Sequence, residues 1–165
     1  MAGRDDRVLI RTPAESELED VRLLLRAVWH DTYDTTLGRD NVIELSTRWH
    51  APAALAAQRV ASDTCFLVAE ADGRLVGHAC ATMRVPPLLV LGRLYVLPAH
   101  QRRGIGGQLL AAAIAAHPGA ATIVLKVEAA NRKAIAFYDR AGFSVTRAAV
   151  EDGAQMLHLE KALSG

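Results

Sequence analysis

The amino-acid sequence predicts a single domain of mixed α and β structure. Three observations support this prediction: a length of 165 residues, a composition of 51% apolar and 22% charged residues, and an alternation of β-rich runs with segments of helical periodicity. A chain of this length is sufficient for one hydrophobic core, and its composition argues against intrinsic disorder. Because no linker, internal repeat or low-complexity stretch interrupts the chain, we expect one domain over residues 1–165.

The first half of the chain predicts a strand, two helices and a β-hairpin. They are expected, in that order, at residues 7–11, 12–29, 41–60 and 64–83. Thr12 and Glu15 suit a capping box and Pro13 suits the first helical position, after which apolar residues recur at helical spacing. Pro52 is expected to break or bend the second helix. The Asp-Gly pair within residues 71–74 is typical of a hairpin turn.

The second half predicts strands and helices in alternation, followed by two final strands. The strands are expected at residues 88–97, 121–128, 143–150 and 154–161, one helix follows the Gly-rich connection 101–107 and runs to about residue 117, and the other is expected at residues 131–141. The apolar run at residues 88–97 predicts a central strand buried on both faces. Asn131 is a favourable N-cap for the second of these helices, and Gly142 is a favourable residue just beyond its end.

Charge, cysteine content and hydropathy narrow the function classes. The net charge of +1 supplies no overall field to attract nucleic acid, so any bound anion must be held locally. Cys65 and Cys80 form no CxxC pair, and we expect two buried thiols in a reducing compartment and no metal site. Residues 1–11 lack an apolar signal core and no run is long enough to span a bilayer. These features predict a cytoplasmic protein without membrane or nucleic-acid partners.

Residues 101–107 carry the clearest chemical signal. The sequence Gln-Arg-Arg-Gly-Ile-Gly-Gly follows a buried strand and opens a helix. Backbone N–H groups at a helix start lack intrahelical partners and lie at the positive end of the helix dipole, so they bind phosphate where no side chain blocks them. Arg102 and Arg103 add local positive charge. The segment suits a pyrophosphate, but it lacks a third glycine and a Gly-Lys-Ser/Thr end, and an ordinary tight turn remains the alternative.

Two motifs together resemble the GNAT superfamily of N-acetyltransferases. The first is Gln-x-x-Gly-x-Gly after Val-x-Pro, which is similar to the acetyl-coenzyme A signature of that superfamily. The second is residues 125–143, a strand followed by Asn131, a Phe-Tyr pair and Gly-Phe. The resemblance is specific over residues 88–145 and weak before residue 64. It implies a mostly antiparallel central sheet of about six to seven strands with a splayed central pair, flanked by about four helices.

The resemblance implies that acetyl-coenzyme A is the co-substrate. Its pantetheine arm would pair with the main chain of Leu94 and Val96, and the Leu94 N–H would stabilise the oxyanion of the tetrahedral intermediate. The family pattern assigns cofactor contacts to Leu94, Tyr95, Val96, Gln101, Arg102, Arg103, Gly104, Ile105, Gly106, Gly107, Asn131, Phe137 and Tyr138. For Asn131 the alternative is helix capping alone, and for Phe137 it is packing in the core.

Tyr138 matches the tyrosine that acts as general acid in the family, and the alternative is a packed aromatic residue. Relatives often carry a glutamate base on the central strand, but residues 88–93 contain no carboxylate. Glu128 is our candidate base, and His78, Glu44, Asp34 or a relaying water are alternatives. For each acid the alternative is a surface role, and for His78 it is a structural position in a strand.

The acceptor site is expected to include Trp29, Tyr33 and His78. Residues 29–38 are rich in aromatic and acidic side chains, which would attract a cationic amine, and the alternative is a helix end with two packing aromatics. Trp49 and His50 are expected either in the core or at the rim of this site.

The sequence therefore predicts an N-acetyltransferase that moves an acetyl group from acetyl-coenzyme A to a primary amine by direct attack in a ternary complex. The acceptor would be a small-molecule amine or a peptide amine, and the protein a monomer or homodimer. The alternative is a non-catalytic acyl-coenzyme A sensor or interaction module, which would bind the cofactor without turnover.

Overall fold

Seven strands form one sheet in the part of the chain that the computed structural model describes, residues 7–85 and 87–164. Their order across the sheet is β1-β2-β3-β4-β5-β7-β6, and every neighbouring pair is antiparallel except β4 and β5. The strands are β1 (Leu9–Arg11), β2 (Thr64–Ala71), β3 (Arg74–Met83), β4 (Leu88–Val96), β5 (Thr122–Glu128), β6 (Ser144–Glu151) and β7 (Ala154–Ala162). The mixed class and the mostly antiparallel sheet are as predicted, while residues 1–6 lie outside the described residues.

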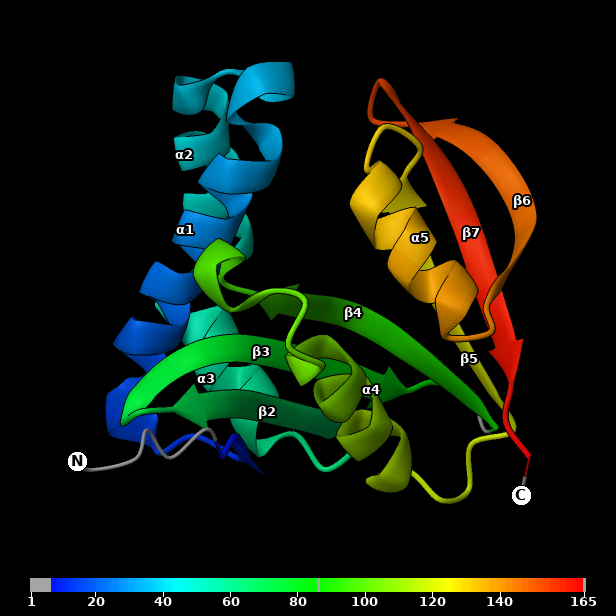
Figure 1. Ribbon diagram of the computed structural model, residues 1–165, viewed down its shortest axis with the longest axis horizontal. Helices are drawn as coiled ribbons and strands as arrows, with labels where there is room; N and C mark the ends of the chain where they lie inside the picture. Colours follow the sequence, from blue (N-terminus) through cyan, green and yellow to red (C-terminus); the bar gives the residue numbers. More distant parts are fainter. Residues whose placement is uncertain (1–6, 86, 165) are drawn as a thin grey trace.

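Helices cover both faces of this sheet. Within the described residues they are α1 (Leu18–Leu37), α2 (Arg39–Trp49), α3 (Pro52–Val60), α4 (Ile105–Ala115) and α5 (Arg132–Arg140), with 3-10 turns at Glu15–Glu17 and Pro98–His100. α1 and α3 pack against one face, and α4 and α5 against the other. Figure 1 shows α1 and α2 on one side of the molecule and α5 with β5, β6 and β7 on the other. Pro52 divides the second predicted helix in two, which gives five helices instead of about four.

Both predicted ends of the first helix need correction. The capping residue is Ala14, whose N–H donates to Glu17 Oε1 over 2.9 Å, so neither Thr12 nor Glu15 forms the predicted capping box. The helix also continues well beyond residue 29, to Leu37, and within this extension Thr32 Oγ1 donates to the Val28 carbonyl over 2.8 Å. It ends at Leu37, because the next residue, Gly38, has a φ of 81°, which is incompatible with a helix.

β4 and β5 part after three residue pairs. Their pairing covers only Leu88–Thr122, Leu89–Ile123 and Val90–Val124. Beyond these pairs β5 continues beside β7 as far as Glu128, while β4 continues beside β3 as far as Val96. The splayed central pair is thus present. The prediction that β4 is buried on both faces is wrong for its second half, where the residues are only partly buried because β5 has moved away.

A bulge at Gly92 sets which side chains of β4 face which helix. Leu91 pairs with Ala81 and Arg93 with Cys80, so Gly92 is the extra residue. Because side chains alternate along a strand, one extra residue shifts the pattern by one position. Leu94 therefore joins Leu91 on the α4 and α5 face, while Arg93 and Tyr95 face α1 and α3.

Candidate active site

The second half of β4 presents free main-chain groups to the space that β5 leaves. The Leu97 N–H donates to the Val76 carbonyl of β3 over 2.8 Å, so by alternation the N–H groups of Leu94 and Val96 point away from β3. The Val96 carbonyl agrees with this orientation, because it accepts from Gln101 Nε2 over 2.9 Å and not from β3. An extended ligand can therefore pair with this edge as a strand would.

The start of α4 is open beside that edge. Arg102 and Gly104 have φ angles of 64° and 79°, which turn the chain sharply into the helix. The first α4 amide with a helical acceptor is that of Gln108, which donates to the Gly104 carbonyl over 3.1 Å. A Cβ placed at Gly104 or Gly107 would meet no atom within 4 Å. The preceding amides are thus unshielded, as a phosphate site requires.

Gly106 has a different role from its neighbours. A Cβ at this position would lie 3.3 Å from Phe137 Cε2, so the missing side chain allows α5 to approach the start of α4. Phe137 also contacts the Tyr138 ring, with ring centroids 5.1 Å apart. The packing alternative for Phe137 is confirmed, and a cofactor contact stays a prediction.

The Tyr138 ring is buried among aromatic residues, but its hydroxyl is accessible. The ring centroid lies 5.3 Å from that of Phe143, and only 8% of the residue is exposed. Its hydroxyl makes no hydrogen bond in the described part of the chain, yet it is not a buried unsatisfied atom, so solvent reaches it. Burial raises the pKa of Tyr138, and the nearby phenols of Tyr95 and Tyr33 raise it further.

Tyr33 links the end of α1 to the opposite half of the molecule. Burial raises the pKa of its phenol, with smaller contributions from Tyr95 and Glu128. The side chain of Asn131 interacts with the same phenol and opposes this increase. Asn131 also caps α5, since its Oδ1 accepts from the Ala134 N–H over 3.3 Å, which confirms the capping prediction.

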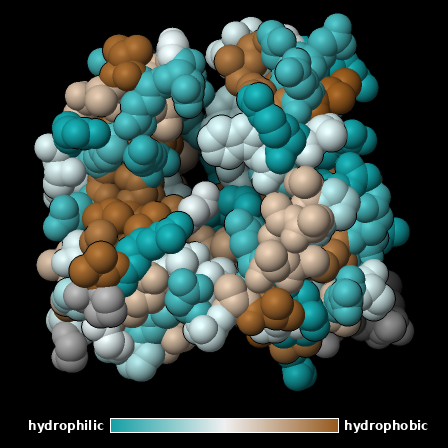
Figure 2. Space-filling model, turned by 180° about the vertical axis from the view of Figure 1, so that it is seen from behind, coloured by the Kyte–Doolittle hydropathy of each residue, from teal (hydrophilic) through white to brown (hydrophobic). Residues whose placement is uncertain are grey.

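These residues define a central cleft between the two halves of the molecule. Its members come from α1, β4, the end of β5 and α5, and are Trp29, Tyr33, Tyr95, Glu128, Asn131 and Tyr138. Viewed from behind, the surface is hollowed between the part built by α1 and α2 and the part built by α5 and β5–β7 (Figure 2). The structure thus brings the predicted acid, the candidate base and two predicted acceptor residues close together.

Trp29 forms the α1 wall of the central cleft. Its Nε1 donates to the Tyr95 hydroxyl over 3.3 Å, and its ring meets those of Tyr33 and His50 edge-on at 5.0 and 5.3 Å. The side chain of Tyr95, expected from the sequence only as part of the cofactor edge, thus faces the acceptor side. Sequence reasoning missed this because the bulge at Gly92 decides the orientation.

His78 is not available as a base or as an acceptor residue. It is fully buried on β3, its Nδ1 donates to the Leu67 carbonyl over 2.8 Å, and its Nε2 accepts from Arg93 Nε over 3.2 Å. Burial, reinforced by the Arg93 charge, lowers the pKa of His78 to about 3. The ring is a neutral structural element, which corrects the prediction that it lines the acceptor site.

The other residues considered for the acceptor site or as a base differ in their exposure and in their partners. His50 is buried, and burial lowers its pKa to about 4, whereas Trp49 is 58% exposed. Asp34 pairs with His30 over 2.7 Å, and Glu44 is exposed on α2. His100 is a residue that sequence reasoning missed: its Nδ1 is buried without a hydrogen-bond partner in the described residues, immediately before the Gly-rich segment.

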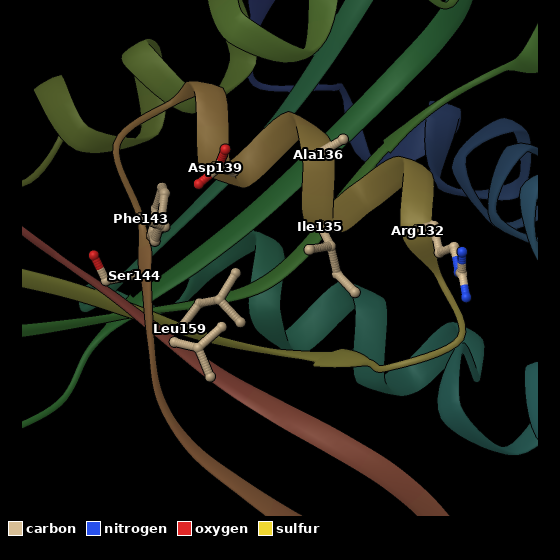
Figure 3. Close-up of a pocket in the computed structure, with 8 residues that line it drawn as sticks. Arg132, Ile135, Ala136, Asp139, Phe143, Ser144 and Leu159 are labelled. Carbon is tan, nitrogen blue, oxygen red and sulfur yellow. The ribbon is translucent and has the colours of Figure 1, made fainter.

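Two surface pockets lie on the α4 and α5 side, away from the central cleft. One of about 330 Å³ separates α5 from β6 and β7, and Figure 3 shows Ile135 and Leu159 facing each other across it. The other, about 370 Å³, lies between α4 and α5 and includes Gly107, Phe137 and Arg140. The second adjoins the open start of α4.

In the described residues no three His, Cys, Asp or Glu side chains gather as metal ligands, and no helix is long and apolar enough to cross a bilayer.

Comparison with known proteins agrees with this geometry. Residues 24–143 match the model of the acetyltransferase (GNAT) family. The crystal structure of the PaiA N-acetyltransferase of Thermoplasma acidophilum in complex with coenzyme A superposes with a TM-score of 0.87 at 26% identity, covering 95% of this chain and 99% of that one. The chain belongs to the GNAT acetyltransferase family.

Two curated relatives match over shorter stretches. Mycothiol acetyltransferase of Acidimicrobium ferrooxidans is 42% identical over 86 residues, which cover 48% of this chain and 28% of that protein. The uncharacterized N-acetyltransferase YhfO of Bacillus subtilis is 31% identical over 100 residues, 56% of this chain and 67% of that protein. The chain thus matches less than a third of the length of the first relative.

Proposed function

We propose that the protein transfers an acetyl group from acetyl-coenzyme A to a primary amine by direct attack in a ternary complex. The observation that carries this proposal is the unshielded start of α4 beside the free edge of β4. One element offers amides for a diphosphate and the other offers a strand edge for the pantetheine arm. The coenzyme A held by the Thermoplasma acidophilum relative supports the same assignment.

The binding path follows from the positions of these elements. The amides of Ile105, Gly106 and Gly107 bind the diphosphate, with exposed Arg102 and Arg103 adding positive charge. The pocket between α4 and α5 offers apolar walls together with the cation of Arg140, which suits a nucleotide. The pantetheine arm then runs along β4 toward Leu94.

In the transfer step the amine nitrogen attacks the thioester carbonyl carbon. A C–N bond forms, and the carbonyl oxygen becomes an oxyanion that the Leu94 N–H stabilises. The intermediate collapses with cleavage of the C–S bond, so the sulfur leaves with the electron pair. One proton must leave the nitrogen and one must reach the sulfur. Glu128 accepts the proton from the nitrogen, directly or through water. Tyr138 assists at the sulfur, where it donates a hydrogen bond.

The environment of Tyr138 defines its part in this step. Because burial raises its pKa, the phenol stays protonated throughout the neutral range. An ordinary thiol, with a pKa of about 8.5, is a stronger acid than this phenol. Tyr138 therefore acts mainly by donating a hydrogen bond to the developing thiolate, and solvent completes protonation of the sulfur.

The test has two parts that separate binding from catalysis. Calorimetry should detect binding of coenzyme A, and thiol release from acetyl-coenzyme A should rise with a suitable amine in a panel of small amines and peptides. Binding without turnover on every amine would support the alternative of a non-catalytic sensor, which the absence of a carboxylate from residues 88–93 favours. Absence of binding to folded protein would overturn the proposal.

A further inference from the structure

Arg93 is a partly buried cation that has no carboxylate partner among residues 7–85 and 87–164. Its Nε donates to His78 Nε2 over 3.2 Å, its Nη2 donates to Gln58 Oε1, and its guanidinium lies 5.9 Å from the centroid of the Phe66 ring. All three neighbours are uncharged. None of the ion pairs in the described part of the chain involves Arg93. Such an arrangement is unusual, because charges removed from water are generally paired.

The free edge of this guanidinium is accessible. Within the described residues its Nε donates to His78 and one Nη2 N–H to Gln58, and the neutral thiol of Cys80 is a further partner of the guanidinium. The buried unsatisfied side-chain nitrogens and oxygens there consist of His100 Nδ1 alone, so solvent reaches Nη1 of Arg93. The two remaining Nη1 donors and the second Nη2 donor form the edge that binds a carboxylate in bidentate fashion.

The position of Arg93 relates this edge to the reaction. Arg93 precedes Leu94, the proposed oxyanion donor, and its side chain lies on the opposite face of β4 from that of Leu94. Tyr95, two residues further along, shares the Arg93 face and bonds Trp29 in the central cleft. Arg93 thus lies on the same face of the sheet as Tyr95 and one residue before the proposed oxyanion donor. After burial, the charge of Arg93 is the second cause that lowers the pKa of His50, which contacts Trp29 in the central cleft.

We propose that Arg93 binds a carboxylate of the acceptor, and that the acceptor is an amine with a carboxylate close to the reacting nitrogen, as in an amino acid. The guanidinium holds the carboxylate while the amine points toward Leu94 and Glu128. This inference rests on the proposed function, because it names the substrate class for the same cleft. It also explains why an uncompensated cation is retained where no described protein group neutralises it.

The first experiment uses the wild-type protein. An equimolar mixture of amino acids and their matching carboxamides is supplied with acetyl-coenzyme A, and acetylated products are quantified by mass spectrometry. We expect acids to exceed their amides by about tenfold or more in kcat/KM, the value of a charged hydrogen-bonded pair. The α-amine of a carboxamide is less basic than the α-amine of the matching acid, so more of it is unprotonated at neutral pH. Intrinsic reactivity therefore favours the carboxamide and works against the expected result.

Variants then test the assignment to Arg93. Arg93→Gln removes the charge and should lower the acid-to-amide ratio by about tenfold, while Arg93→Lys should restore it only partly because lysine lacks the bidentate fork. Arg74→Gln, at an exposed position on the β2–β3 hairpin, is the matched control and should leave the ratio unchanged. Circular dichroism verifies that each variant is folded.

The outcomes separate this inference from the proposed function. A wild-type preference for amides, or coenzyme A binding with no acetylation of any carboxylated amine, overturns the inference. An acid preference that survives Arg93→Gln in folded protein overturns the role of this residue. Failure to bind coenzyme A would instead defeat the proposed function itself.

Discussion

The Tyr138 side chain combines a fixed ring with an accessible hydroxyl group. Its ring is fixed by edge contacts to Phe137 and Phe143, and its hydroxyl is not among the buried unsatisfied atoms of the described residues. Fixed rings hold a donor in place without an ordering cost at the moment of reaction. Leu94 contributes only its main-chain N–H to the reaction, while its side chain packs against the hydrophobic core.

Replacing Tyr138 with phenylalanine tests the role of the hydroxyl. Tyr138→Phe keeps the aromatic contacts and should therefore fold normally and bind coenzyme A with little change in Kd. Turnover should fall by about 100-fold, within the range for a group that assists proton transfer. Steady-state thiol release and calorimetry on the same preparation measure the two quantities. Unchanged kcat would remove Tyr138 from the mechanism.

Gly107 offers a cleaner test of the phosphate site than Gly106. A side chain at Gly106 would displace Phe137, whereas one at Gly107 enters open space. Gly107→Glu places a negative charge at the start of α4 and should weaken coenzyme A binding by more than about tenfold, because it repels the diphosphate at close range. Gly119→Glu adds the same charge at another open glycine and is the control. Equal affinities for the two variants would refute the site.

Among the elements, β4 and α1 show how small features set function. The bulge at Gly92 decides that Arg93 and Tyr95 face α1, and the extension of α1 to Leu37 brings Tyr33 to β5 and α5. A helix that ended at residue 29 would leave the central cleft without one wall. The start of α5 also depends on a single residue, because the side chain of Asn131 caps it.

The cap of α5 separates two roles that the sequence left open for Asn131. Asn131→Ala removes the acceptor of the Ala134 N–H and should lower the free energy of unfolding by about 1 kcal/mol. Asn131→Asp keeps a capping oxygen and should fold with nearly wild-type stability. Thermal unfolding measures this difference. If Asn131 also contacts the cofactor, coenzyme A affinity should fall in both variants; if it serves only as a cap, binding by the Asp variant should match wild type.

For the molecule as a whole, two buried neutral histidines make stability depend on pH. Burial lowers the pKa values of His50 and His78 to about 4 and about 3, from about 6.5 in the unfolded chain. The unfolded state therefore binds more protons below pH 6.5, so stability is complete above that pH and is lost as the pH falls. Between pH 7 and pH 5 the free energy of unfolding should decrease by roughly 4 kcal/mol, or about 10 °C in Tm.

The window from pH 7 to pH 5 isolates these histidines from the carboxylates. Pairing with Arg11 lowers the pKa of Glu17 to about 2, so its contribution is lost only below pH 4.5. Differential scanning calorimetry across the window measures the slope. His78→Gln removes one titrating group and should reduce the slope to about half, and a wild-type Tm that is flat between pH 7 and 5 would contradict the assignment.

Much of the fold and of the cofactor site could be predicted from local sequence signals. Hydrophobic periodicity located every strand and most helix boundaries, Asn131 marked the start of α5, and Pro52 marked a break between helices. The glycines at positions 104 and 107 suggested the unshielded start of α4, whereas Gly106 serves the packing of Phe137. These signals suffice because capping, turn formation and helix starts depend on residues within a few positions of one another.

The acceptor side of the central cleft could not be predicted in this way. The bulge at Gly92, the burial of His78 and the unpaired charge of Arg93 each depend on groups from strands and helices distant in the sequence. A bulge reverses which face a side chain occupies, and burial converts a candidate base into a structural ring. The sequence thus established the family and predicted an anion-binding loop, whereas long-range packing set the character of the acceptor site, because the charge and accessibility of a side chain depend on what surrounds it.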